Sequence, residues 1–287
     1  MPEHHQRAGI NINGALRGKE DATEAAGVVP EVYQVVQGDR KRGMKIYLLH
    51  VGELIQGSMN LHMESMLCKL DAARREKVMS AKTVQGKAAE LGAGLLLQRA
   101  VQDWQREKLV DNPEGGPGES GEMARKIVLP KQSPQIRRCT VSDLLAELAE
   151  PLSLTYRYGE KGKPYLENLP LFFSLSHSGE YVLCAVSRRE LGADIQKIQP
   201  ADELKLAKRF FSESECRILE GCESPRERQR LFFGFWTRKE AYGKLTGEGL
   251  AAAIREDMQS AAGKRGVEWV DISPPDGYAL AICRLTG

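Results

Sequence analysis

One short segment of the chain, "WTRKEAYGKL" from Trp236 to Leu245, carries a carboxylate and an ammonium at helical spacing. Trp236, Glu240 and Lys244 follow one another at intervals of four, so a helix would present them along one face. The carboxylate is suited to accept a proton or bind a cation, and the ammonium is suited to neutralise a phosphate. A solvated helix with a Glu–Lys pair explains the same spacing without any chemistry. Residues elsewhere in the chain are needed to distinguish the two interpretations.

A second candidate carboxylate, Asp194, lies in "LGADIQKI", which has the pattern of a strand. Strand alternation places Gly192, Asp194 and Gln196 on one face. An Asp at the end of a strand often only satisfies a turn. Asp194, Gln196 and Glu240 together would instead offer the hard oxygen ligands that suit Mg²⁺.

His177 is the third candidate, because it stands in the polar turn "SLSHSG" between two apolar runs. The other histidines form no metal-ligand spacing with it, and a lone His beside a strand is usually structural. Next to Ser176 and Ser178, however, it is placed to donate a hydrogen bond to a phosphate. Several further cations, each typical of a solvated charge when taken alone, are Lys163 in a Gly/Pro turn and Arg74, Arg75 and Lys77 in "LDAARREK".

The elements that must position these residues occur in the same order twice. A strand, "MKIYLLHV" from Met44, precedes two helical stretches and the strand "YVLCAVSR"; "LGADIQKI" likewise precedes two helical stretches and the strand "YALAICRL". We therefore predict an α+β fold with two similar lobes, residues 44–189 and 190–287, related as a pseudo-dimer. Each lobe is expected to be a small antiparallel sheet with helices on one face.

Two segments have no sustained periodicity. Residues 1–43 are rich in Gly, Ala and charge and are predicted to be a disordered extension, and Met44 is an alternative start of the chain. The second segment, residues 111–124, combines Gly, Pro and acidic residues and is predicted to be a mobile loop within the first lobe.

Composition excludes several classes of protein. The formal net charge of +2 argues against a general nucleic-acid binder, and the chain has neither a P-loop nor a Rossmann glycine pattern. No run approaches the ~18 apolar residues of a membrane span, and the first residues lack the apolar centre of a secretory signal. Six cysteines without a CxxC pair favour a reducing compartment, so we expect a cytoplasmic protein.

Four motifs in a fixed order resemble one family. They are "GKP" at 162–164, "SLSHSG" at 174–179, "GADIQ" at 192–196 and "FWTRKEAYGKLTGEGL" at 235–250. From Met44 to the C-terminus the chain resembles 4′-phosphopantetheinyl transferases of the surfactin-synthetase-activating type. These enzymes move the phosphopantetheine arm of coenzyme A onto a serine of an apo acyl or peptidyl carrier protein of fatty acid, polyketide or nonribosomal peptide biosynthesis.

The resemblance implies a role for each candidate residue. Asp194 and Glu240 would hold Mg²⁺, Glu240 would also be the base for the carrier serine, and Lys244 would neutralise the departing phosphate. The residues expected to hold coenzyme A are Arg74, Lys77, Lys163, Ser176, His177, Lys239 and Lys244. The expected partners are coenzyme A and an apo carrier protein, with no nucleic acid and no membrane, and the protein is expected to be a monomer.

One departure from the family pattern concerns the metal. Many members carry a second carboxylate two residues after the Asp, where this chain has Gln196, whose single carbonyl oxygen is a weaker ligand for Mg²⁺. Gln196 is therefore the feature that favours an alternative, a catalytically impaired module of the same fold that binds coenzyme A or carrier proteins. The intact Asp194, Glu240 and Lys244 favour the enzyme.

Overall fold

The computed structural model describes residues 33–36, 43–52, 54–55, 59–111, 136–139, 141–148, 150–254, 256–258 and 266–286. The chain divides into two compact units. The N-terminal unit contains Val32–Tyr156 and Leu166–Arg188, and the C-terminal unit contains Arg157–Tyr165 and Arg189–Gly287. The sequence suggested a boundary after residue 189, whereas the segment Arg157–Tyr165 groups with the C-terminal unit. The predicted mobile loop after Asp111 lies outside the described residues.

An antiparallel five-stranded sheet with the order β3-β1-β2-β7-β6 forms the framework of the N-terminal unit. Its strands are β1 (Tyr33–Val36), β2 (Met44–His50), β3 (Ile136–Cys139), β6 (Phe172–Ser178) and β7 (Tyr181–Ser187). Strand β1 pairs with both β2 and β3. This corrects the expectation that the sheet begins at Met44, because backbone pairing draws four residues of the 1–43 segment into it. The remainder of that segment, apart from Gly43, lies outside the described residues.

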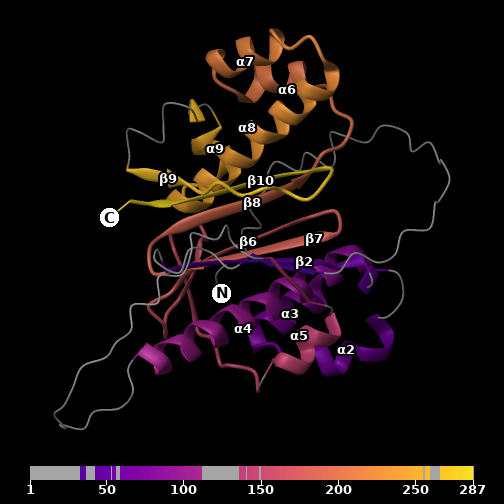
Figure 1. Ribbon diagram of the computed structural model, residues 1–287, viewed down its shortest axis with the longest axis vertical. Coiled ribbons are helices and arrows are strands. Elements are labelled where there is room, and N and C mark those ends of the chain that lie inside the picture. The colour runs from indigo at the N-terminus through magenta and orange to yellow at the C-terminus, as the bar shows by residue number, and fades with distance from the viewer. Residues whose placement is uncertain are drawn as a thin grey trace, which may run out of the picture. The chain divides into compact units, whose positions relative to one another are not determined.

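The helices of the N-terminal unit lie along one face of this sheet (Figure 1). They are α2 (Met59–Leu67), α3 (Ala72–Ser80), α4 (Val84–Asp111) and α5 (Val141–Glu147). The long helix α4 packs against β2, β6 and β7 and contributes a run of buried aliphatic side chains between Ala88 and Val101. Burial of this apolar stretch against the sheet is the main source of stability for the unit.

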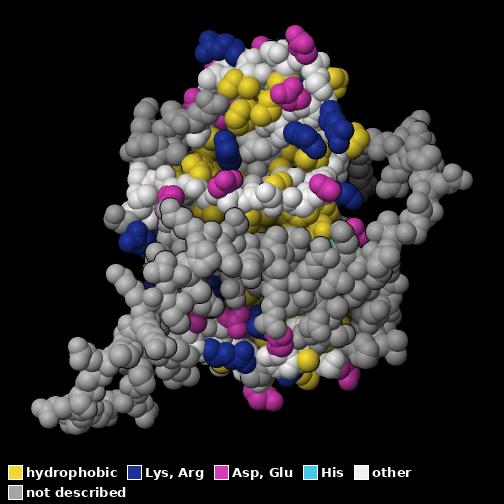
Figure 2. All heavy atoms as spheres, in the orientation of Figure 1, with side chains coloured by type: hydrophobic (Ala, Val, Ile, Leu, Met, Phe, Trp, Pro, Cys, Tyr) yellow, Lys and Arg dark blue, Asp and Glu magenta, His cyan; other side chains and the backbone are white. Residues whose placement is uncertain are grey.

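The C-terminal unit has a three-stranded antiparallel sheet with the order β8-β10-β9. Its strands are β8 (Leu191–Lys197), β9 (Val267–Trp269) and β10 (Tyr278–Leu285), and its helices are α6 (Glu203–Phe210), α7 (Glu213–Glu220), α8 (Pro225–Thr246) and α9 (Leu250–Ala253). Helix α8 packs on β8 and β10. Over α6, α7 and α8 the surface drawn in Figure 2 mixes cationic, anionic and hydrophobic side chains. Two short strands, β4 (Tyr156–Tyr158) and β5 (Pro164–Leu166), pair separately.

The internal repeat seen in the sequence corresponds to a shared topology. In each unit the opening strand pairs antiparallel with the closing strand, β2 with β7 and β8 with β10. The register is also equivalent, because the tyrosine that starts each closing strand pairs with the last residue of the opening strand, Tyr181 with His50 and Tyr278 with Lys197. A long helix, α4 or α8, packs on both strands. Each unit is thus α+β, as predicted.

Among the helices that the structure describes, none has the length and apolar character needed to cross a bilayer.

Candidate functional site

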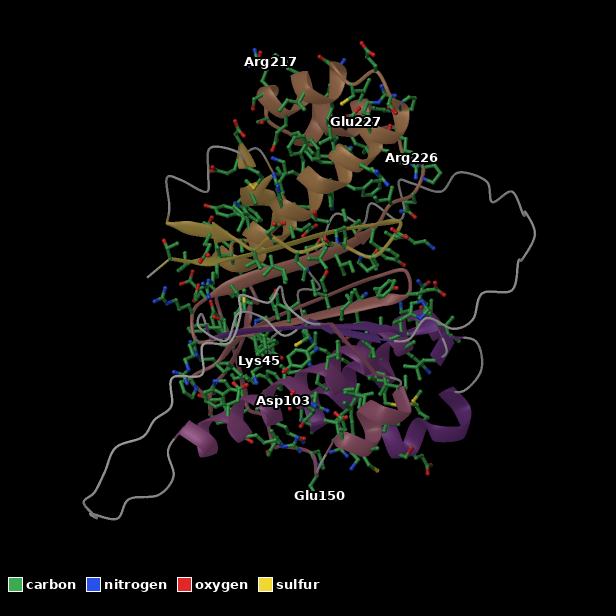
Figure 3. The ribbon with its side chains drawn as sticks, viewed as in Figure 1. Lys45, Asp103, Glu150, Arg217, Arg226 and Glu227 are labelled. Atoms are coloured by element: carbon green, nitrogen blue, oxygen red, sulfur yellow. The ribbon has the colours of Figure 1, made fainter. Side chains whose placement is uncertain are left out.

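Helix α8 carries the segment with which the sequence analysis began. Ser224 caps its N-terminus by accepting a hydrogen bond from the Glu227 backbone N–H at 3.4 Å, and Pro225 occupies the first turn. Figure 3 labels Glu227 in that first turn; Lys244 lies in the last. This charge order, acidic first and basic last, favours the helix dipole. The helix ends at Gly247, whose φ of 72° is the left-handed conformation that glycine adopts most readily.

Aromatic packing anchors the middle of α8. Trp236 is 1% exposed and packs with its ring centroid 6.0 Å from that of Phe210 and 6.2 Å from that of Phe232. Phe211 stacks on Phe232 at 5.1 Å and completes the cluster. Trp236 is therefore a core residue that holds the helix in place. The polar residues that follow it, and not the indole, are the candidates for chemistry.

Gly192 brings α8 and β8 into direct backbone contact. A Cβ atom placed on Gly192 would lie 1.9 Å from the Ala241 carbonyl oxygen and 2.5 Å from the Leu245 nitrogen, distances that no real side chain tolerates. The absence of a side chain therefore allows the two backbones to meet. Because Asp194 lies two residues further along the strand, it shares this face and is directed toward the helix.

Asp194 and Lys244 form an ion pair at this contact. The Lys244 ammonium donates to Asp194 Oδ1 at 2.8 Å and to the Ala193 carbonyl oxygen at 3.1 Å. The Asp194 side chain is only 7% exposed, whereas that of Lys244 is 31% exposed. The structure thus brings together two of the residues that the sequence singled out, with the ammonium at the more accessible end of the pair.

Glu240 is the third member of this group, on the same helix and one turn before Lys244. Burial, together with the nearby charge of Asp194 and opposed by Lys244, raises the pKa of its carboxyl group to about 7. A carboxylate with a pKa close to neutral is well suited to accept a proton from a hydroxyl group. Asp194, Glu240 and Lys244 thus form a compact acid–base group, which we call the β8–α8 site.

The β8–α8 site has fewer candidate metal ligands than a site in which protein side chains supply every ligand. Within the part of the chain that the structure describes, no cluster of three or more His, Cys, Asp or Glu residues is placed to hold a metal ion. The β8–α8 site offers two carboxylates, and Gln196, half-buried on β8, follows Asp194 by two residues. Two carboxylates with an amide nearby are compatible with a cation that keeps water or substrate oxygens in its coordination shell, as Mg²⁺ commonly does.

Lys239 corrects one expectation from the sequence. Its side chain is 0% exposed, and its ammonium lies 2.7 Å from Glu215 Oε2 and donates to the Glu256 carbonyl oxygen at 2.6 Å. The ammonium also lies 5.1 Å from the ring centroid of Phe211. The charge that suggested a cation for a diphosphate therefore links α8 to α7 inside the core, although Lys239 is the immediate neighbour of Glu240.

Lys163 also has a structural contact where the resemblance implied contact with coenzyme A. Its ammonium donates to the Leu245 carbonyl oxygen at 2.6 Å and lies 3.5 Å from Glu190 Oε2. Its side chain is 10% exposed, and burial lowers its pKa. A cation at the C-terminal end of a helix stabilises the last carbonyl groups, so Lys163 helps to hold the end of α8 that carries Lys244.

Arg74, Lys77 and His177 lie in the N-terminal unit close to Glu90, a residue that the sequence did not single out. Glu90 on α4 lies with Oε2 3.6 Å from Arg74 Nη1 and with Oε1 4.0 Å from His177 Nε2. Burial lowers the pKa of Lys77, the positive charge of Arg74 lowers it further, and Glu90 opposes this shift. Ser176 precedes His177 on β6 and is buried. The one sequence signal for Glu90 is its isolation as a carboxylate in the apolar stretch "AAELGAGLLL".

Comparison with known proteins identifies similar chains. A family model described as the 4′-phosphopantetheinyl transferase superfamily matches residues 190–283, which include the whole β8–α8 site. A 4′-phosphopantetheinyl transferase of Bacillus subtilis is 34% identical over 155 residues, which are 51% of this chain and 67% of that protein.

Two further relatives match over a shorter region. The 4′-phosphopantetheinyl transferase HetI of Nostoc sp. strain PCC 7120 is 41% identical over 108 residues, which are 36% of this chain and 45% of that protein. The 4′-phosphopantetheinyl transferase psf-1 of Bacillus pumilus is 47% identical over 108 residues, which are 34% of this chain and 45% of that protein. The chain thus spans two thirds of the Bacillus subtilis relative and less than half of these two.

Proposed function

The chain belongs to the 4′-phosphopantetheinyl transferase family of enzymes, and from this premise we propose that it transfers the 4′-phosphopantetheine arm of coenzyme A to a serine of an apo acyl or peptidyl carrier protein, releasing adenosine 3′,5′-bisphosphate. The observation that carries this proposal is the β8–α8 site itself. There the Lys244 ammonium lies 2.8 Å from Asp194, and burial, with the charge of Asp194, raises the pKa of Glu240 to about 7.

The proposed reaction uses each member of the site. Glu240 takes the proton from the carrier serine, whose Oγ forms a bond to the pantetheine-side phosphorus of the coenzyme A diphosphate. The bond between that phosphorus and the bridging oxygen breaks, and adenosine 3′,5′-bisphosphate leaves with the bond electrons. Lys244 neutralises the charge that develops on the departing phosphate.

We propose Mg²⁺ as the cofactor, held by Asp194 and Glu240 with Gln196 nearby. The donor set fits the ion, because carboxylate and amide oxygens are hard ligands and the buried Asp194 carboxylate repels the partly buried Glu240 carboxylate. Mg²⁺ bound there would supply positive charge to the diphosphate oxygens. Arg74, Lys77, Ser176 and His177 are proposed to bind the adenosine end and its 3′-phosphate. Lys163 and Lys239 are not proposed to bind coenzyme A, because other groups of the protein hold their ammonium groups.

The two units are proposed to be the halves of a pseudo-dimer, with a single copy of the chain as the active protein. Their shared topology supports this, because an opening strand, a long helix and a closing strand pack alike in both. We propose the cytoplasm as the location. The cysteines whose side chains are described are all free thiols, as a reducing compartment would leave them.

The experiment that tests the proposed function measures the mass of the carrier protein. We expect a panel of apo carrier proteins, incubated with the protein, coenzyme A and Mg²⁺, to gain one phosphopantetheine group each by intact mass spectrometry. Omission of coenzyme A or addition of excess EDTA should abolish the gain. Binding of a carrier without any gain in mass would instead identify the chain as the non-catalytic module that Gln196 suggested.

Replacing His177 by Ala is expected to raise the KM for coenzyme A by about tenfold with little change in kcat, because a hydrogen bond to the 3′-phosphate stabilises ground state and transition state equally. Steady-state kinetics with coenzyme A and with 3′-dephospho-coenzyme A provide the measurement. The dephosphorylated substrate should show almost no penalty. An equal rise in KM for both substrates would exclude the proposed role of His177.

Replacing Gln196 by Glu is expected to tighten Mg²⁺ binding by about tenfold, since it adds an anionic oxygen on the strand face that carries Asp194. Calorimetric titration with Mg²⁺ measures the affinity directly, and the Mg²⁺ dependence of the transfer rate measures its consequence. Gln196→Ala serves as the matched control and should bind Mg²⁺ almost as the natural protein does. An unchanged affinity in Gln196→Glu would place this side chain beyond reach of the ion.

A further inference from the structure

Glu90 occupies the centre of the cation cluster in the N-terminal unit, where the proposed function requires an anion-binding site. Its side chain is 28% exposed and lies in the second turn of α4. One carboxylate oxygen is 3.6 Å from Arg74 and the other is 4.0 Å from His177. Both oxygens of a single carboxylate therefore face the guanidinium and the imidazole proposed to bind the 3′-phosphate.

The contacts of Arg74 and His177 determine which of their neighbouring carboxylates a ligand can displace. Arg74 is 5% exposed, and its guanidinium lies 5.8 Å from the ring centroid of Tyr156. Asp71, the other carboxylate close to Arg74, caps α3 by accepting from the Arg74 backbone N–H at 3.0 Å, and its second oxygen accepts from the Tyr156 hydroxyl at 2.9 Å. Both carboxylate oxygens of Asp71 are thus engaged in contacts that stabilise the fold. Glu90 also reaches His177, whose side chain is 47% exposed.

We propose that Glu90 competes with the 3′-phosphate of coenzyme A for Arg74 and His177 and so sets the selectivity of the protein between 3′-phosphorylated and 3′-dephosphorylated ligands. A phosphate that approaches these two side chains must displace the carboxylate that already faces them, and the repulsion between the two anions lowers its affinity. A ligand without the 3′-phosphate leaves the Glu90 contacts intact and meets no such penalty. The inference rests on the proposed function in taking coenzyme A as the ligand and in assigning its 3′-phosphate to Arg74 and His177.

If Glu90 competes with the 3′-phosphate, removal of its negative charge should increase the affinity for a 3′-phosphorylated nucleotide. Glu90→Gln keeps the shape of the side chain and its place in the helix but removes the anion. Its Kd for adenosine 3′,5′-bisphosphate is expected to fall by about fivefold, while its Kd for adenosine 5′-monophosphate should stay within about twofold. In Glu90→Gln/His177→Ala the gain should shrink, because one of the two side chains that Glu90 releases is absent.

Isothermal titration of both nucleotides against the full chain tests this. Glu107→Gln, on the same helix but paired with Lys45, is the matched control and should leave both affinities unchanged. Glu90→Ala repeats the test with a strong helix former, so poor folding of one variant does not decide the outcome. Weaker or unchanged binding of adenosine 3′,5′-bisphosphate in the Glu90 variants, or an equal gain for both nucleotides, would overturn the competition.

The transfer assay separates this inference from the proposed function. If the natural chain modifies apo carrier proteins but its Glu90 variants discriminate between the two nucleotides no better than the natural chain does, only the role of Glu90 is wrong. If the natural chain neither modifies a carrier nor binds either nucleotide, the proposed function fails and the competition fails with it.

Discussion

Replacing Glu240 by Gln is expected to lower the rate of phosphopantetheine transfer by about 10²–10⁴-fold, the usual contribution of one general base, without unfolding the protein. The amide keeps the shape of the side chain but cannot accept the proton of the carrier serine. It also removes one of the two carboxylates proposed to hold Mg²⁺, so the loss should be larger at low Mg²⁺ than at saturation. Single-turnover transfer measured by intact mass gives the rate.

Glu223→Gln is the matched control, because this glutamate is exposed on the segment between α7 and α8 and has no part in the proposed mechanism. Its transfer rate should equal that of the natural chain, and both variants should unfold within a few degrees of it. If Glu240→Gln retains more than about a tenth of the natural rate at saturating Mg²⁺, another group must take the proton.

Replacing Lys239 by Met is expected to destabilise the C-terminal unit by about 3–5 kcal/mol, because it leaves the buried carboxylate of Glu215 without its cation. Glu215 cannot move to water, since its oxygens also accept from the Ser212 and Met258 backbone N–H groups. A loss of this size should lower the melting temperature by about 10 °C. Thermal unfolding followed by circular dichroism provides the measurement.

Two further variants show whether burial of the Lys239–Glu215 pair causes the expected loss of stability. Lys208→Met removes an equivalent Lys–Glu pair that is exposed, at 67% and 45% for Lys208 and Glu220, and should change the melting temperature by only about 1–2 °C. Lys239→Met/Glu215→Gln should recover part of the lost stability, because no unpaired charge remains in the core. If Lys239→Met melts within about 2 °C of the natural chain, the pair does not hold α8 against α7.

Local patterns in the sequence were sufficient to predict much of the architecture. Alternation in "LGADIQKI" predicted a strand, and β8 occupies residues 191–197 with Gly192 and Asp194 facing α8. The repeated order of strands and helices predicted two α+β units, and the paired opening and closing strands have equivalent registers. Spacing along the strand and along the helix depends only on residues close in the chain, which is why it can be recognised without the fold.

The motif order in the sequence alone likewise singled out Asp194, Glu240 and Lys244. Their meeting in the structure depends on Gly192, whose missing side chain lets α8 approach β8. The sequence marked this glycine only as a strand position. The raised pKa of Glu240 also required the fold, because burial and the charge of Asp194 produce it.

Only tertiary packing determines which contacts the individual cations make. Lys239 and Lys244 lie on one helix and looked equivalent, yet the Lys239 ammonium is fully buried against a carboxylate of α7, whereas the Lys244 side chain stays 31% exposed beside the buried Asp194 carboxylate of β8. Lys163 reaches a carbonyl group 82 residues away, and Glu90 meets cations from α3 and β6. The free energy of a charge depends on its burial and on partners distant in sequence, so residue type and local spacing determined where cations occur, and only the packed structure determined which of them remain accessible to a ligand.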